Sequence, residues 1–151
     1  MLPASAAVAL VLPMSKILSF DQASRVSGYA VFENGNLIHF GKFCFDDDDF
    51  GIRLKNIRNA VKKLIDTWNP DEVIFEDIQL QSNVGNNVET FKKLAEVFGV
   101  IYELVTELNI PHRAVLSTVW KSKLKITGKK RAEQKSNAQK HVLETYGVKA
   151  T

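Results

Sequence analysis

Two short apolar runs of the chain each end in an acidic residue. Residues 17–20 precede Asp21, and residues 73–75 precede Glu76. Short runs that are rich in β-branched and aromatic side chains are typical of buried strands. If the two strands are parallel neighbours, both acids lie at the carboxyl edge of the sheet, where open α/β sheets bind their ligands. Paired carboxylates suit Mg²⁺ or Mn²⁺, whereas the simpler alternative is that each acid only caps a strand at the surface.

The rest of the pattern predicts one domain of alternating strands and helices. Asn34-Gly35 between two apolar runs is a strong hairpin signal, so the first three strands should form an antiparallel meander. Apolar residues at helical spacing predict two helices, and a final helix is predicted to end at Gly147. The predicted elements, in chain order, are strands over 17–21, 28–33 and 37–45, a helix over 57–68, a strand ending at Glu76, a helix from 86 or 87 to 108, a strand over 112–116 and a helix over about 131–146.

A turn of small polar residues follows Asp21 and leads into the second strand. This segment resembles the first motif of the RuvC family of Holliday junction resolvases, in which the strand ends Asp-Pro-Gly-Ser-Arg-x-Thr-Gly-Tyr-Gly. The chain has Gln22-Ala23 in place of Pro-Gly, which resembles the phage-encoded branch, and Ser27 in place of threonine. The likeness continues in order through Glu76, residues 87–100 and residues 120–146. The motif residues that the chain keeps are Asp21, Ser24, Arg25, Gly28 and Tyr29.

The resemblance implies a fold and an activity. The fold is ribonuclease H-like, an α/β architecture with a mixed five-stranded sheet and helices on both faces. The activity is that of a structure-specific DNA endonuclease, which resolves Holliday junctions and other branched DNA by two-metal phosphodiester hydrolysis. Its cofactor is Mg²⁺, for which Mn²⁺ is expected to substitute.

The resemblance also assigns roles to individual residues. Asp21 is the ligand shared by both ions, and Glu76, rather than the neighbouring Asp77, is a ligand of one. Lys121 and Lys135 match positions at which the family places cations that steady phosphate oxygens as charge develops.

Three further residues are implied as DNA contacts near the site. Ser24 and Arg25 lie beside Asp21 in the motif. Gln79 belongs to the segment in which cellular members carry an aromatic side chain that stacks in the junction. Since stacking contributes about 1–3 kcal/mol per base, its absence predicts a junction preference that is relaxed toward other branched DNA.

The basic residues are concentrated in the last part of the chain. Residues 112–151 hold ten lysines and arginines against two glutamates, a net charge of +8, whereas the rest of the chain has a net charge of −5. A basic segment beside an acidic pair is typical of nucleases, although a solvated charged surface is the alternative. Lys129, Lys130 and Arg131 are the basic cluster that we expect to bind DNA.

The second helix carries a broad apolar stripe. The stripe is wide for a helix that covers one face of a sheet, and the resemblance implies that part of it forms a homodimer interface, with plain core packing as the alternative. Its members are Phe91, Leu94, Ala95, Phe98, Ile101, Tyr102, Val105 and Leu108.

The two ends of the chain and its single cysteine give further expectations. Residues 1–13 are interpreted as an upstream extension or a cloning scar, too short to span a bilayer, and residues 14–151 as the nuclease domain without its last helix. The last catalytic acids of the family lie in a helix beyond the point where this sequence stops, so the chain as given is expected to be short of acids and could be inactive. Cys44 as the only cysteine excludes an intramolecular disulfide and fits a cytoplasmic protein, in the host cytoplasm if phage-encoded.

Two other functions compete with a nuclease. A DNA-binding module that has lost catalysis would explain the shortage of acids. An actin-like or sugar-kinase-like ATPase would explain Asp21, the turn of small residues and Gly28, but such proteins enclose their nucleotide with two domains of this size.

Overall fold

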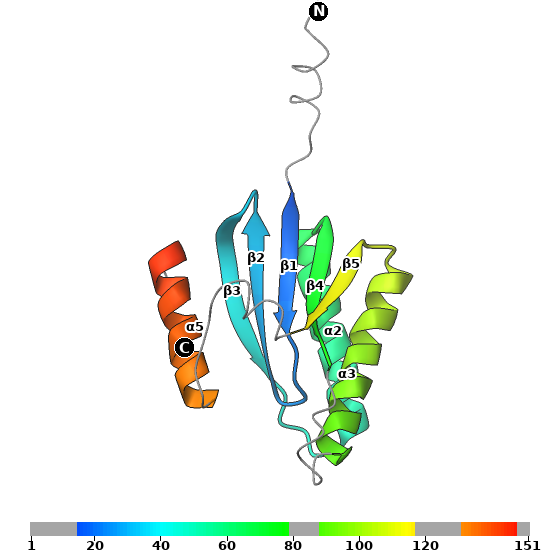
Figure 1. Cartoon of the computed structure of the whole chain (residues 1–151). Coiled ribbons are helices and arrows are strands. Elements are labelled where there is room, and N and C mark those ends of the chain that lie inside the picture. The colour runs from blue at the N-terminus through cyan, green and yellow to red at the C-terminus, as the bar shows by residue number, and fades with distance from the viewer. Residues whose placement is uncertain (1–14, 79–87, 117–130, 148–151) are drawn as a thin grey trace, which may run out of the picture.

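The fold is built on one mixed sheet of five strands. The computed structural model describes residues 15–78, 88–116 and 131–147. The strand order is β3-β2-β1-β4-β5 (Figure 1). The strands are β1 (Lys16–Asp21), β2 (Val26–Glu33), β3 (Asn36–Cys44), β4 (Glu72–Asp77) and β5 (His112–Leu116).

The first three strands form the predicted antiparallel meander. β1 pairs with β2 and β2 with β3, both antiparallel. The hairpin between β2 and β3 turns at Asn34 and Gly35, whose φ angles are +51° and +80°. Positive φ at both central residues matches the right-handed twist of the flanking strands, which is why Asn-Gly favours this turn. On the other side of β1, β4 and then β5 pair in parallel.

One face of the sheet is covered by helices α2 (Phe50–Trp68) and α3 (Val88–Glu107). Alternate residues of the central strands enter the core beneath these helices, among them Leu18 in β1 and Val73 in β4, both 0% exposed. The helices contribute the remaining buried side chains. These are Ile57, Val61, Leu64 and Ile65 from α2, and Val97, Ile101, Leu104 and Val105 from α3.

Helix α5 (Arg131–Tyr146) contacts the opposite face of the sheet. The Tyr146 ring centroid lies 5.7 Å from that of Phe32 in β2. Phe32 follows the buried Val31, so the two side chains point to opposite faces. Gly147 ends the helix as predicted, with a φ of +69° and an N–H group that donates to the Leu143 carbonyl at 2.9 Å. The expected ribonuclease H-like arrangement, with helices on both faces, is confirmed.

Asp49, the last of the four acidic residues 46–49, caps helix α2. The Asp49 carboxylate accepts a hydrogen bond from Ile52 N–H at 3.1 Å, and the Asp47 carboxylate accepts one from Asp49 N–H at 2.9 Å. A carboxylate at this position satisfies a helix N–H group that has no partner within the helix. At the other end of α2, Asn69 takes a left-handed conformation with a φ of +46°.

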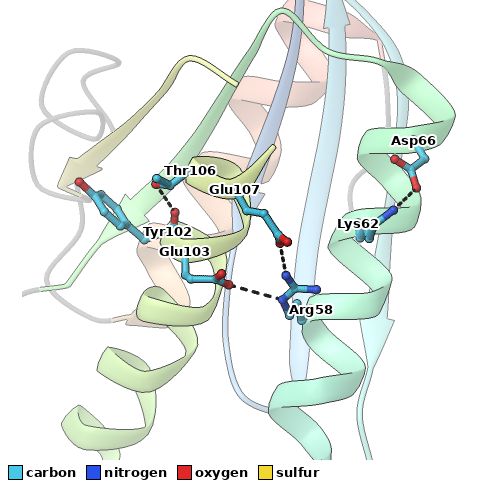
Figure 2. Close-up of polar contacts among 7 residues, drawn as sticks. All are labelled: Arg58, Lys62, Asp66, Tyr102, Glu103, Thr106 and Glu107. Carbon is cyan, nitrogen blue, oxygen red and sulfur yellow. Dashed lines mark hydrogen bonds and ion pairs between the residues drawn. The ribbon is translucent and has the colours of Figure 1, made fainter. Parts of the chain in front are cut away.

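A polar contact joins α3 to α2 at the surface. Figure 2 shows Arg58 of α2 reaching two glutamates of α3, with Arg58 Nε 3.5 Å from Glu103 and Arg58 Nη2 paired with Glu107. Tyr102 points away from α2 in the same view.

The observed burial corrects part of the apolar stripe predicted for α3. Val97 and Leu104, which the stripe omits, are 0% exposed, whereas Tyr102, which it includes, is 50% exposed. Phe91 and Phe98 are half-buried. The buried face thus combines Ile101 and Val105 of the stripe with Val97 and Leu104, because the helix period alone does not fix which side the sheet covers.

Candidate active site

Asp21 and Glu76 lie side by side at the ends of neighbouring parallel strands. The β1–β4 register pairs Phe20 with Phe75, and the next residue of each strand is one of the two acids. Phe20 and Phe75 are 4% and 1% exposed in the core. Because side chains alternate, both acids point to the opposite face. Adjacent strands are about 4.8 Å apart, so this register brings the two predicted carboxylates together.

Asp77 lies outside this pair. It follows Glu76 in β4, so its side chain leaves the other face of the sheet. Its carboxylate accepts a hydrogen bond at 2.9 Å from the N–H group of Ile78, the next residue. This local contact agrees with Glu76, rather than Asp77, facing the site.

A buried amide beside the acids was missed by the sequence reasoning. Gln22 directly follows Asp21 and is 7% exposed. Its side-chain oxygen accepts from Glu76 N–H at 3.1 Å, and its side-chain nitrogen donates to the Glu76 carbonyl. No local sequence pattern links Gln22 to Glu76, which lies 54 positions later in the chain. The only signal that marked Gln22 was its departure from the family motif.

The turn after β1 carries the two predicted DNA-contact residues, Ser24 and Arg25. It is closed by Ser27, whose hydroxyl accepts from Ala23 N–H at 3.0 Å and donates to the Ala23 carbonyl at 2.9 Å. Ser24 is half-buried and Arg25 is exposed. The structure therefore places both residues beside Asp21 and leaves the guanidinium accessible.

Lys135 is exposed in the first half of α5. Tyr146, at the other end of this helix, contacts Phe32, which pairs with Ile17 near the start of β1. Eleven helical residues span about 16 Å, and Figure 1 shows the N-terminal half of α5 at the same end of the sheet as the end of β1. The helix lies toward β3, however, and no contact ties Lys135 to the acids in the part of the chain that the structure describes.

Several predicted residues lie outside the described residues. The extension over residues 1–13 is one such segment, and the side chain of Arg131 is not described although its backbone begins α5. The others are Gln79, Lys121, Lys129 and Lys130.

One basic residue of the last third is already paired. Arg113 in β5 contacts Glu72 at the start of β4, with 2.7 Å between Arg113 Nε and Glu72 Oε1. This pair reduces the positive charge that β5 can offer to a phosphate.

The donor chemistry of the pair fits a hard divalent cation. Mg²⁺ prefers oxygen ligands and is commonly held by one or two carboxylates together with water and substrate phosphates. Asp21 and Glu76 supply this kind of ligand. Within residues 15–78, 88–116 and 131–147, no group of three or more histidine, cysteine, aspartate or glutamate side chains could hold a metal ion. The described part of the site thus offers two carboxylates to such an ion.

None of the helices described is long and apolar enough to cross a membrane.

The chain is similar to proteins that process DNA junctions. A family model for crossover junction endodeoxyribonuclease RuvC matches residues 17–149. The RuvC of Shewanella woodyi is 30% identical over 135 residues, which cover 87% of this chain and 76% of that protein. The RuvC of Shewanella oneidensis is 27% identical with the same coverage.

Solved structures share the fold. Thermus thermophilus RuvC in complex with a Holliday junction substrate has a TM-score of 0.70 at 16% identity and covers 89% of this chain and 81% of its own. The yeast mitochondrial Holliday junction resolvase Ydc2 has a TM-score of 0.56 at 16% identity, over 87% of this chain and 62% of its own.

The family match spans every described strand except the first residue of β1, and it includes both acids at the sheet edge. The chain belongs to the RuvC family of crossover junction endodeoxyribonucleases.

Proposed function

We propose that this protein is a Holliday junction endonuclease whose reaction centre is the Asp21–Glu76 pair. The observation that carries the proposal is the parallel register of β1 and β4, which sets the two carboxylates side by side on one face. Family membership supports the substrate, because the relatives are named for cleavage of crossover junctions. The family match also favours a nuclease over an actin-like or sugar-kinase-like ATPase.

Asp21 and Glu76 would hold divalent cations, Mg²⁺ or Mn²⁺. Bound there, the metal would activate water and stabilise the leaving oxygen of the scissile phosphodiester. The chain itself contributes the positions of the two carboxylates and the basic side chains around them. Arg25, exposed in the turn beside Asp21, would bind a flanking phosphate, with Ser24 as a second contact.

The lysines and the basic cluster complete this proposal. Lys121 and Lys135 would steady phosphate oxygens near the reaction centre. Lys129, Lys130 and Arg131 would bind the duplex arms by displacing counterions. Gln79, in place of a stacking aromatic, would leave the preference for a four-way junction weaker and admit other branched DNA.

A homodimer would match the symmetry of the substrate. Paired nicks in a four-way junction require two active sites related by a two-fold axis. On α3, the half-exposed Tyr102 points away from α2, and the half-buried Phe98 lies beside it with ring centroids 6.0 Å apart. Phe91, another predicted contact, is half-buried on the same helix. Tyr102 and His112 of edge strand β5 pack with ring centroids 5.2 Å apart. This surface, which we call the α3–β5 surface, is the proposed contact with a second copy of the chain.

A junction-binding protein without catalysis is the second candidate. It is favoured by the two-carboxylate donor set of the described residues. Both candidates bind junctions, so only the chemical step separates them.

The test is a cleavage assay on synthetic four-way junctions in Mg²⁺, in Mn²⁺ and in EDTA, with linear duplexes of the same sequence as control. The proposal predicts metal-dependent paired nicks in the junction and none in the duplex. Junction binding without cleavage in either ion would instead identify the binding protein.

A further inference from the structure

The backbone of Glu76 is held by a side chain at the end of the neighbouring strand. Backbone pairing of β1 with β4 ends at Phe20 and Phe75. At the next residue of β4, the Gln22 side-chain amide replaces the backbone partner that β1 no longer supplies. It accepts from Glu76 N–H at 3.1 Å and donates to the Glu76 carbonyl. A primary amide carries the same donor and acceptor as a peptide group. Gln22 therefore extends the ladder after the backbone of β1 has turned away.

The other end of this connection is also fixed. Gln22 is 7% exposed and lies between the last residue of β1 and the turn that the Ser27 hydroxyl closes onto Ala23. A buried amide whose backbone is held on both sides has little freedom to move. A shift of the Gln22 side chain would therefore shift the Glu76 backbone relative to Asp21.

We infer that Gln22 is a positioning residue that sets the separation of the Asp21 and Glu76 carboxylates. The inference rests on the proposed function, because it gives the two acids a shared ligand. Metal sites tolerate displacements of about 0.5 Å, and Mg²⁺ demands near-ideal geometry. Without the Gln22 amide, the Glu76 backbone would lose two hydrogen bonds at the point where its side chain begins.

The central variant is Gln22→Met, which keeps the length of the side chain and removes both hydrogen bonds. The matched control is Asn34→Ala, which removes the side-chain acceptor of Ser15 N–H (3.0 Å) at the other end of β1 from the acids and leaves the net charge unchanged. Four quantities are measured for each variant: the melting temperature, the Mn²⁺ affinity of the protein alone from the free-ion paramagnetic resonance signal, and kcat and KM on a four-way junction.

Gln22→Met should weaken Mn²⁺ binding about 10-fold or more and lower kcat by a similar factor, in the range typical for groups that orient metal ligands. KM should stay within about two-fold, because Gln22 is buried and its amide is bonded to the Glu76 backbone. Asn34→Ala should lower the melting temperature while keeping both Mn²⁺ affinity and kcat. Parental Mn²⁺ affinity and kcat in Gln22→Met, or equal losses in Asn34→Ala, would overturn the inference.

A second variant, Gln22→Asn, tests the inference if Gln22→Met fails to fold. Gln22→Asn keeps a buried amide but is one methylene shorter, so it cannot reach both backbone atoms of Glu76. It should show the same loss of Mn²⁺ affinity, and the Glu76 amide should exchange its hydrogen faster than in the parent. Parental exchange at Glu76 together with parental Mn²⁺ affinity would contradict the inference.

The outcomes also separate the inference from the proposed function. If the parent binds Mn²⁺ without cleaving junctions and Gln22→Met weakens that binding, the inference stands and the proposed reaction fails. If the parent cleaves and the Gln22 variants behave like it, the inference alone fails. A parent that neither binds Mn²⁺ nor cleaves would overturn both.

Discussion

Two small residues of β2 lie on the same face of the sheet as the Asp21 carboxylate. Gly28 pairs with Asp21 and Ala30 pairs with Ser19. Directly opposed residues of an antiparallel pair share a face, so no large side chain of β2 stands directly beside Asp21. A Cβ atom built at Gly28 would meet nothing within 4 Å. We expect a phosphodiester to approach Asp21 through this open space.

Gly28→Val tests that approach. The backbone of Gly28 is in a strand and its φ is not positive, so valine should be tolerated and could raise stability by up to about 1 kcal/mol. Its branched side chain should instead obstruct the substrate and lower single-turnover cleavage by about 10-fold or more, since about 1 Å of misplacement costs up to 100-fold. Gly28→Ala should fall between parent and valine. Parental cleavage by a folded Gly28→Val protein would show that DNA does not approach over β2.

At the scale of secondary-structure elements, the helix caps and turns follow from local sequence. Asp49 stands at the start of α2 and its carboxylate accepts from Ile52 N–H at 3.1 Å. Close by, Arg53 is 3% exposed and donates through Nη1 to the Asp47 carbonyl at 2.7 Å. The acidic segment is thus joined to the helix at two points.

Asp49→Ala should destabilise the protein by about 1 kcal/mol, the usual cost of removing an aspartate N-cap. For a chain of this size that loss lowers the melting temperature by about 2–4 °C. Asp48→Ala, which removes the same charge from an exposed neighbour, is the control and should melt within about 1 °C of the parent. Equal melting temperatures for the two variants would show that the Asp49 cap does not stabilise α2.

Local patterns explain which elements were predictable. The Asn34-Gly35 turn and the end of α5 at Gly147 depend on residues adjacent in the chain, and both were predicted correctly. The burial of Arg53 and the contact of Gln22 with Glu76 depend on elements brought together by folding, and neither left a local pattern. The positions of Asp21 and Glu76 could be predicted because each follows a short apolar run that forms a strand. The hydrogen bonds of Gln22 to the Glu76 backbone could not be predicted.

At the scale of the whole molecule, charge is distributed unevenly. Residues 112–151 carry a net charge of +8 and the remainder −5. The Arg113–Glu72 pair shows that part of the positive charge is used within the fold. The basic residues at 129–131 are the cluster that we expect to face DNA.

Replacing Lys129, Lys130 and Arg131 together by alanine should flatten the salt dependence of junction binding. Each phosphate contact contributes about −0.9 to the slope of log affinity against log salt on duplex DNA, so three lost contacts would reduce the slope by nearly three. Replacement of Lys55, Lys62 and Lys63 on α2 removes the same charge from exposed positions and is the control. A slope unaffected by the first substitution, or flattened equally by both, would contradict the assignment.

Tyr102→Glu should produce a folded monomer that nicks one strand without the paired second cut. A charge at a half-exposed position can be hydrated in the monomer but is costly in an apolar contact. Lys92→Glu, exposed on the same helix, controls for the added negative charge. Sedimentation and paired-nick counts are the measurements. A parent that sediments as a monomer at micromolar concentration, with and without junction DNA, would rule out the dimer.

The most direct test of the central claim compares cleavage and binding in Asp21→Asn and Glu76→Gln. Both changes keep side-chain size and remove one ligand charge, so each should reduce junction cleavage in Mg²⁺ to about one-hundredth of the parental rate or less, the scale on which a preorganised electrostatic group acts. Junction affinity should stay near parental or rise, because a negative charge facing phosphate is lost. Near-parental cleavage by either variant would contradict the claim that Asp21 and Glu76 form the reaction centre.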